Sequence, residues 1–480
     1  MNRKMVFYTV GQMIWLEALL MLFPAAVSLC YSEHAVWAFF TAILAALAIG
    51  TLMVLLSRPD DYVIYAKEGF VIVAFSWIAM SIIGALPFVI SGEIPSYIDA
   101  LFETVSGFTT TGASILADVE SVGYGINFWR CFTHWIGGMG VLVFIMAVIP
   151  NFSDRSIHIM RAEMPGPIVG KLMPKVKDTA KVLYLIYIAI TALEFILLVC
   201  GGMPVYDSLV HSFATAGTGG FGIMNDSIAS YSPYCQWVIA VFMLLFGVNF
   251  NVYYMILIKR ASTAFKSTEL WVYFGIVAAA SAAVCINIYP LFENIADAVR
   301  SSVFQVTSIM TTTGFVTTNT NAWPEFSKSV LLLLMFIGGC AGSTAGGFKV
   351  SRLIILAKAL KSEMKHMLHP RSVNIISFEG KKLEKDTVTS VSVYMIAYIF
   401  SLFMLLFLLS FEPLDTETKL TAAMSCFNNV GPFFSRTVSC ANYSVFSPFS
   451  KLLLSAAMLL GRLEIFPILI VFSPSIWSKK

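Results

Sequence analysis

The most regular feature of the sequence is a series of long apolar stretches separated by short polar segments. Six stretches without Asp, Glu, Lys or Arg cover residues 69–92, 131–153, 227–258, 270–292, 329–348 and 387–411. Four further segments, residues 5–30, 34–57, 182–203 and 452–477, carry at most two charged residues each. Because a helix needs about 20 apolar residues to cross the hydrocarbon core of a bilayer, the pattern predicts ten transmembrane helices.

Composition supports an all-α polytopic protein in contact with the lipid bilayer. Hydrophobic residues make up 58% of the chain and charged residues 12%, against about 25% charged in soluble domains. This balance excludes a soluble enzyme and a nucleic-acid binder. The eight cysteines include no CxxC pair, which argues against a metal or disulfide framework and predicts no cofactor. His134 and His211 lack the spacing of a metal site and are interpreted as structural.

The positive charges predict the orientation of the chain. With Arg3 and Lys4 inside, ten spans place 24 of the 31 Lys and Arg residues on the inner side, as the positive-inside rule requires. Both termini are therefore predicted to be inside. The first span is too long for a signal peptide and is followed at once by the second. The basic inner loops at residues 151–181 and 349–386 offer a docking surface, although ordinary positive-inside charge produces the same pattern.

From residue 69 onward, one unit occurs four times: a span, a short half-apolar segment, a polar turn containing glycine, and a second span. The short segments are residues 96–108, 205–216, 294–310 and 416–427, with Asp207 and Thr416 as expected helix N-caps. The four turns, numbered first to fourth, are TTTGAS at 109–114, GTGGFG at 217–222, TTTGFV at 311–316 and NNVGPF at 428–433. Each short segment is too short to span, which predicts helices that enter the membrane and turn back.

The turns suggest a pathway for a cation. Non-helical backbone at membrane depth is tolerated where it is buried in protein or lines water, so four such turns are expected to converge on one aqueous path. One such turn alone is typical of an outer loop, but four at equivalent places favour the path. The negative ends of four helix dipoles and the turn carbonyls would stabilise a dehydrated cation. The central glycines, Gly112, Gly220, Gly314 and Gly431, allow backbone angles that direct carbonyls inward.

These motifs, joined to GGCAGSTAGGFKVSR at 338–352 and LLGRLEIF at 459–466, resemble the Trk/Ktr/HKT superfamily of cation transporters over nearly the whole chain. The resemblance implies a pseudo-fourfold pore of four M1–P–M2 repeats behind two N-terminal transmembrane helices, taking up potassium across the bacterial inner membrane. The implied divisions are residues 1–67 for the N-terminal helices and 68–153, 154–260, 261–365 and 366–480 for the four pore repeats.

The resemblance also assigns a selectivity filter. Its expected residues are Thr110, Thr111, Gly112, Thr218, Gly219, Gly220, Thr312, Thr313, Gly314, Asn429, Val430 and Gly431, with potassium bound at Thr111, Gly112, Gly219, Gly220, Thr313, Gly314, Val430 and Gly431. In this family, glycine in all four turns accompanies potassium preference and serine in the first accompanies sodium. Gly217 and the pair Asn429–Val430 depart from the hydroxyl-rich pattern, so coordination is expected to be unequal. None of the turns has the full TVGYG of a potassium channel, so selectivity over sodium is expected to be moderate.

A gate is expected at residues 338–347, which contain five glycines in ten positions and cannot form a stable helix interior. A phosphate-binding loop is excluded because Phe348 stands where lysine is required. The expected gate residues are Gly338, Gly339, Gly342, Gly346, Gly347, Lys349 and Arg462. Arg462 lies within the last span, where an unpaired charge is costly. It is expected to hold the loop closed through the loop carbonyls, the alternative being an arginine that snorkels toward the interface.

The expected partners follow from the resemblance: a second copy in a homodimer and a cytosolic nucleotide-binding regulatory subunit of the TrkA type. Potassium is expected as transported ligand, and the chain is not expected to be an enzyme. A sodium-preferring or weakly selective cation transporter of the same fold is the main alternative. A membrane-embedded enzyme would need a cluster of Asp, Arg or His at the membrane face, and a regulatory subunit would leave the four turns without a purpose.

Overall fold

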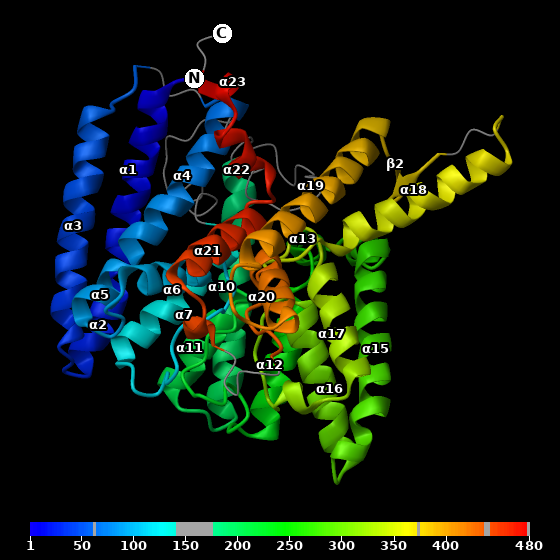
Figure 1. Ribbon diagram of the computed structural model, residues 1–480, viewed down its shortest axis with the longest axis horizontal. Helices are drawn as coiled ribbons and strands as arrows, with labels where there is room; N and C mark the ends of the chain where they lie inside the picture. Colours follow the sequence, from blue (N-terminus) through cyan, green and yellow to red (C-terminus); the bar gives the residue numbers. More distant parts are fainter. Residues whose placement is uncertain (61–63, 141–175, 372–374, 436–441, 478–480) are drawn as a thin grey trace.

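The computed structural model describes residues 1–60, 64–140, 176–371, 375–435 and 442–477, and within these ranges the secondary structure is helical apart from one short hairpin (Figure 1). The N-terminal part comprises α1 (Arg3–Leu20), α2 (Leu22–Cys30), α3 (Ala35–Leu56), α4 (Ala66–Gly84), α5 (Leu86–Ser91), α6 (Tyr97–Phe108) and α7 (Tyr124–Gly138). The middle part comprises α10 (Val176–Cys200), α11 (Val205–Ala216), α12 (Pro233–Phe246), α13 (Phe250–Leu257), α14 (Ala261–Ala264), α15 (Thr268–Ile288), η2 (Tyr289–Leu291) and α16 (Ile295–Met310).

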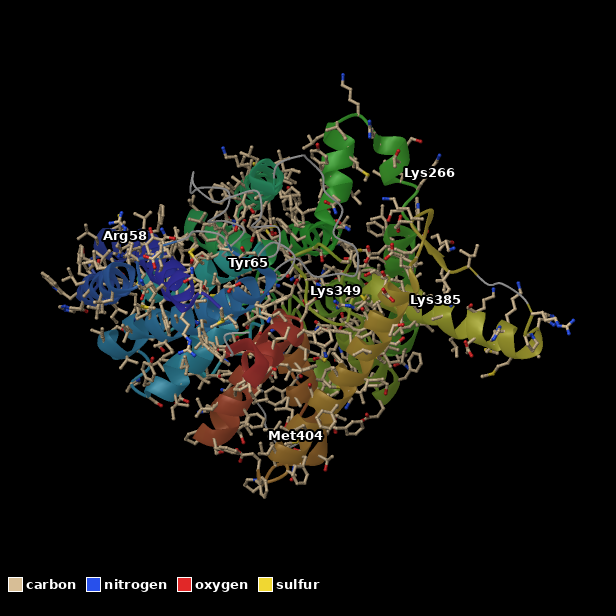
Figure 2. All side chains as sticks on the ribbon, turned by 90° about the horizontal axis from the view of Figure 1, so that it is seen from above. Arg58, Tyr65, Lys266, Lys349, Lys385 and Met404 are labelled. Carbon is tan, nitrogen blue, oxygen red and sulfur yellow. The ribbon has the colours of Figure 1, made fainter. Side chains whose placement is uncertain are left out.

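The C-terminal part begins with η3 (Thr320–Ala322), α17 (Glu325–Ile337) and α18 (Val350–Leu368). A small antiparallel hairpin of β1 (Ser377–Phe378) and β2 (Lys381–Lys382) follows, and then come α19 (Lys385–Leu409), α20 (Thr416–Asn428), η4 (Tyr443–Val445), α21 (Pro448–Arg462), α22 (Phe466–Val471) and α23 (Pro474–Trp477). Figures 1 and 2 show α18 extending sideways from the bundle. Lys349, just before α18, lies near the centre of the molecule in the view from above (Figure 2).

Among the residues that the structure describes, six helical segments are long and apolar enough to cross a membrane. They are Arg3–Cys30, Ala35–Leu56, Lys67–Ser91, Ala180–Cys200, Thr268–Leu291 and Lys385–Leu409. The predicted span at 227–258 is a bent pair, α12 and α13, with 88° between them. The predicted spans at 329–348 and 452–477 are broken after Ile337 and Arg462. The span at 131–153 lies outside the described residues from 141 onward, as do residues 151–175 of the basic inner loop, so the count of ten spans stays a prediction.

The four short segments form α6, α11, α16 and α20, with bounds within one residue of those predicted. The predicted caps are wrong in two of them. Pro204 precedes α11, and Asp207 lies in its first turn instead of capping it. Asp415, one residue before Thr416, caps α20 by accepting the Thr418 N–H. Carboxylates stabilise both positions at a helix N-terminus, so composition alone does not distinguish them.

The outer sides of several long helices are apolar and exposed. Trp37 and Leu55 on α3 and Ile396, Phe400 and Phe403 on α19 each expose most of their surface. The opposite faces pack inward, α1 against α3 and α4, and α15 against α16 and α17. Apolar exposure of this extent is typical of helices that face lipid. The polar turns and the broken helices therefore occupy the interior of a membrane-embedded bundle.

Candidate functional site

Each short helix ends in the same backbone motif. The left-handed position is taken by Thr110, Thr218, Thr312 and Asn429, with φ of 55°, 54°, 55° and 56°. The following amide donates to the carbonyl five residues earlier in all four turns, at 2.8 to 2.9 Å, as Thr111 does to Ser106. This is a Schellman ending, in which glycine or asparagine is usual at the left-handed position. Three β-branched threonines there are strained, and strain of this kind gathers at functional sites.

The four central glycines also have positive φ: 75° at Gly112, 79° at Gly220, 86° at Gly314 and 100° at Gly431. This conformation was predicted for the glycines. The left-handed threonine two residues earlier was not, because no local pattern marks threonine for that region of backbone space.

The turns close into a ring. A Cβ on Gly112 would fall within 3.0 Å of the Gly219 carbonyl oxygen in the second turn. Gly220 stands in the same relation to the Thr313 oxygen, Gly314 to that of Val430 and Gly431 to that of Thr111. In each case the carbonyl belongs to the residue just before the central glycine of the following turn. The fourth turn contacts the first in the same way, so the ring is closed. The predicted filter residues are thus brought together, with no room for a side chain at any of the four glycines.

A cavity of about 580 Å³ lies against this ring, and Gly112, Gly220, Gly314 and Gly431 all line it. Its other lining residues include Asn225, Asp226, Thr317, Thr318 and Asn319. Beside it, the Asn225 amide donates to Asp118 at 2.9 Å, and this hydrogen bond lowers the pKa of the Asp118 carboxyl. Neutral oxygens with nearby carboxylates suit a hydrated cation.

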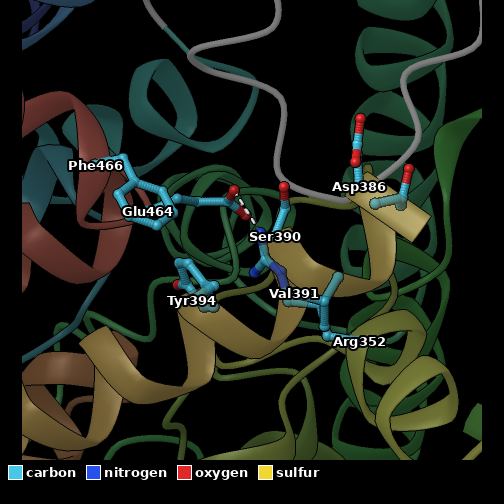
Figure 3. A pocket seen from close by; sticks show the side chains of 8 residues that line it. Arg352, Asp386, Ser390, Val391, Tyr394, Glu464 and Phe466 are labelled. Atoms are coloured by element: carbon cyan, nitrogen blue, oxygen red, sulfur yellow. Dashed lines mark hydrogen bonds and ion pairs between the residues drawn. The ribbon is translucent and has the colours of Figure 1, made fainter. Parts of the chain in front are cut away.

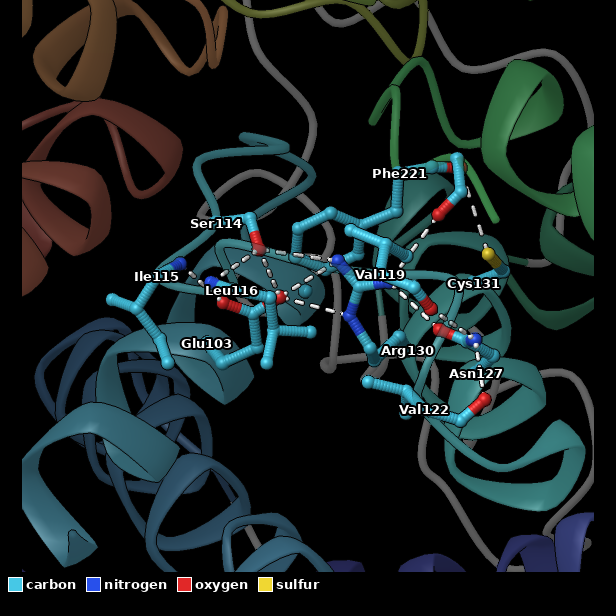
Figure 4. A network of polar contacts seen from close by, with 12 residues as sticks. Glu103, Ser114, Ile115, Leu116, Val119, Val122, Asn127, Arg130, Cys131 and Phe221 are labelled. Atoms are coloured by element: carbon cyan, nitrogen blue, oxygen red, sulfur yellow. Dashed lines mark hydrogen bonds and ion pairs between the residues drawn. The ribbon is translucent and has the colours of Figure 1, made fainter. Parts of the chain in front are cut away.

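A buried ion pair ties the first two turns together (Figure 4). Arg130 of α7 and Glu103 of α6 approach to 2.8 Å, with side chains 1% and 0% exposed. Glu103 accepts the Ser114 hydroxyl at 2.9 Å, and Arg130 donates to the Gly222 carbonyl at 3.3 Å. Removing one partner of such a pair costs about 3–5 kcal/mol. This pairing is not predictable from a local pattern, because 27 residues separate the two side chains.

His134 of α7 occupies the space behind the first two turns. Its Nδ1 lies 2.8 Å from the Gly107 carbonyl oxygen, and its Nε2 accepts the Phe221 N–H at 3.3 Å. With Nε2 as acceptor, Nδ1 carries the proton and donates to Gly107. A Cβ on Gly219 would strike the imidazole ring. His134 therefore positions the second turn against the end of α6.

The break between α17 and α18 is a buried, irregular segment, residues 338–349, hereafter the intramembrane loop. Gly338, Gly342 and Gly347 have positive φ. The loop fits into the bend between α12 and α13: Cys340 N–H donates to the Gly247 carbonyl at 3.0 Å, and Phe250 N–H donates to that of Gly342 at 3.0 Å. The predicted break in the helix is confirmed, and the second broken helix supplies partners for the Cys340 amide and the Gly342 carbonyl.

Arg462, at the end of α21, reaches the intramembrane loop. It donates to the Thr344 carbonyl at 2.9 Å, and to the carbonyls of Gly137 and Gly138 at 2.6 and 2.8 Å. Lys349 is buried and its Nζ donates to the Ala345 carbonyl within the loop. The expected contact between Arg462 and a loop carbonyl is thus present. The link to the end of α7 was not expected.

Glu269, at the start of α15, links the intramembrane loop to the first turn of α18. One carboxylate oxygen accepts the Ala341 N–H at 2.7 Å and the Ser351 N–H at 3.1 Å. The sequence does not mark Glu269 as a site residue, because an acidic residue in a first helical turn is common and needs no tertiary role.

A second cavity, of about 270 Å³, lies beside the loop between α18, α19 and the segment after α21 (Figure 3). Arg352 and Glu464 form an ion pair across it at 2.6 Å, and the Arg352 guanidinium lies 4.0 Å from the centre of the Tyr394 ring. Glu464 and Ile465 both have positive φ, a strained conformation for a β-branched residue. The segment just after Arg462 is therefore also bound, through the ion pair of Glu464 with Arg352, to the first turn of α18.

Comparisons with known proteins agree on one family. The family model described as TrkH, cation transport protein, matches residues 36–273 and 267–479. The chain is 34% identical to the Trk system potassium uptake protein TrkH of Salmonella typhimurium and to that of Escherichia coli K12, covering 100% of each chain. The crystal structure of the potassium transporter TrkH from Vibrio parahaemolyticus matches with a TM-score of 0.90 at 30% identity, over 100% of both chains.

Proposed function

The chain belongs to the TrkH family of cation transport proteins, and from this premise we propose that it takes up potassium through the ring of four turns. It is a multi-pass protein of the bacterial inner membrane. Its relatives are transporters by name, which supports transport over an enzymatic role. The proposal also includes ten spans with both termini inside and four pore repeats in the divisions given above.

The observation that carries the proposal is the closed ring of carbonyl oxygens. The carbonyls of Thr111, Gly219, Thr313 and Val430 each lie against the central glycine of the preceding turn in the ring. Their own N–H groups are occupied by the Schellman bonds, so the carbonyls are the groups left to meet an ion. Four helix ends with partial negative charge, at the foot of a polar cavity, favour a cation that loses its water there.

Glycine at all four central positions supports potassium over sodium as the preferred ion, in line with the family pattern. The turns differ in side chain, with glycine at 219 and valine at 430 where the first and third have threonine. Coordination in this pore is therefore mainly by backbone, and selectivity is moderate. The intramembrane loop, with Lys349 and Arg462, acts as the gate on the inner side. A homodimer and a TrkA-type nucleotide-binding subunit that controls the gate belong to the same proposal.

The experiment that tests the proposal is complementation of a bacterium that lacks its own potassium uptake. We expect the chain to restore growth at low potassium and to take up rubidium. Gly112→Ser is expected to reduce rubidium uptake by roughly tenfold, because Cβ meets the neighbouring carbonyl ring, while sodium flux is retained or raised. Growth and tracer uptake across potassium and sodium concentrations measure both effects.

Failure to restore growth, with the protein confirmed in the membrane and a regulatory subunit co-expressed, would overturn potassium uptake as the function. Equal loss of rubidium and sodium flux in Gly112→Ser would leave transport standing but count against a selectivity role for the first turn.

His134 gives a second prediction for this site. We expect His134→Ala to weaken discrimination between rubidium and sodium by about fivefold or more, since the Phe221 N–H loses its buried acceptor. His134→Gln, whose side-chain oxygen can accept that N–H, is expected to retain more of the discrimination. Competition uptake assays check this. A normal ion preference in His134→Ala would show that α7 positions the turn without the imidazole.

A further inference from the structure

One position in the turns has four different surroundings. Thr110, Thr218, Thr312 and Asn429 occupy the same left-handed place, two residues before the central glycine. The Thr110 hydroxyl has no hydrogen-bond partner among the described residues, and that of Thr218 donates to the carbonyl of Gly217 in its own turn. The Asn429 amide donates to the Thr111 hydroxyl at 3.0 Å and to the Met458 carbonyl at 2.9 Å.

Thr312 differs from these three because its hydroxyl faces the intramembrane loop. The Gly346 N–H donates to Thr312 Oγ1 at 2.6 Å. The next amide, that of Gly347, donates to the Asn428 carbonyl at the base of the fourth turn at 3.0 Å. Two consecutive loop amides therefore dock on two consecutive turns. The Thr312 hydroxyl is the one side-chain acceptor in that docking among the residues the structure describes.

The first turn supplies an internal comparison. Thr110 and Thr312 have the same residue type, the same φ of 55° and complete burial within 1%. The first turn keeps the motif although its Thr110 hydroxyl has no hydrogen-bond partner in the described part of the chain, so this hydroxyl is not needed to build the turn. Removing the hydroxyl at 312 leaves the Gly346 N–H without its acceptor in a buried place, which is a direct loss to the loop.

We propose that Thr312 is a latch residue shared by the filter and the gate: its hydroxyl holds the intramembrane loop against the third turn in the closed state. The role of this hydrogen bond in transport rests on the proposed function. It adds that the loop is fastened to the filter itself, on the side of the third and fourth turns, as well as to Arg462. Opening then requires the Gly346 N–H to leave Thr312, and a change at the third turn alters the gate directly.

The test uses Cys340, a loop cysteine with 1% exposure, as a reporter of loop position. In a background with the other cysteines replaced by alanine, purified and reconstituted protein is reacted with N-ethylmaleimide. We expect Thr312→Val to raise the rate of Cys340 modification by roughly fivefold or more, the size expected for a buried N–H that loses its acceptor. Thr110→Val is the matched control and is expected to react at the parent rate. Thr312→Ser restores the hydroxyl and is expected to stay within about twofold of the parent.

Rubidium uptake without a regulatory subunit is measured on Thr312→Val, and we expect it to rise above that of the parent protein. If Thr312→Val and Thr110→Val react alike, or if Thr312→Ser reacts as fast as Thr312→Val, the latch is overturned. If Thr312→Val does not reach the membrane, Thr312→Ala takes its place against Thr110→Ala. A parent protein that transports no rubidium while Cys340 still separates the two valine variants would refute the proposed function and retain the latch.

Discussion

Alanine at Gly220 is expected to lower rubidium uptake by about tenfold to 100-fold, although it adds a single methyl group. A Cβ at this position would overlap the Thr313 carbonyl oxygen, which is a backbone atom and cannot rotate away. The third turn would have to move, and with it the ring that the four turns form together. Overpacking of this kind costs about 1–3 kcal/mol, and 3 kcal/mol in the free energy of holding an ion corresponds to about 100-fold.

Gly202 offers a matched control for the backbone strain. Its φ of 85° is close to the 79° of Gly220, but no heavy atom of the described residues lies within 4 Å of a Cβ placed there. Alanine at 202 therefore carries the left-handed penalty of about 1–2 kcal/mol and no collision. We expect Gly202→Ala to lower thermal stability and to keep uptake near that of the parent protein. Tracer uptake at equal membrane abundance measures the difference, and equal uptake by the two variants would contradict the steric role of Gly220.

Local signals in the sequence predicted the elements that build this ring. The bounds of α11 are those expected, Val205–Ala216, and the other three short helices differ by one residue. For α11, Pro204 marks the start of the helix and the glycine-bearing turn marks its end. Both signals lie next to the helix in the sequence. The break at 338–347 was predictable for the same reason, since five glycines cannot continue a helix.

Most side-chain partners that are distant in the sequence could not be predicted from it. The Gly346 amide and Thr312 are 34 residues apart, Glu269 and Ala341 are 72 apart, and Arg462 and Gly137 are 325 apart. Repetition identified equivalent positions in the four turns, but not their different neighbours. Residues at equivalent positions of a repeat share the same backbone conformation. The contacts of each side chain depend on the segments of the chain that pack against that turn.

Replacing Arg462 with alanine is expected to raise ion flux without a regulatory subunit by roughly tenfold or more. The guanidinium donates to the Thr344 carbonyl of the loop and to Gly137 and Gly138 at the end of α7. Hydrogen bonds from a charged donor contribute about 1.5–3 kcal/mol each, so losing the Thr344 bond alone shifts the balance between closed and open states by about tenfold. Rubidium uptake and single-channel open probability in reconstituted membranes measure the change.

Arg462→Lys separates two physical reasons for the closed state. Lysine keeps the positive charge that repels a cation near the path, but its compact ammonium does not reproduce the planar fork that reaches three carbonyls. If the fork fastens the loop, Arg462→Lys will conduct almost as freely as Arg462→Ala; if the charge alone bars the ion, it will stay closed. Unchanged flux and open probability in Arg462→Ala would refute a gating role for the residue. Because the contacts to Gly137 and Gly138 also support α7, the thermal midpoints of both variants are measured beside their flux. A difference in flux between two variants with equal thermal midpoints is the effect of the gate.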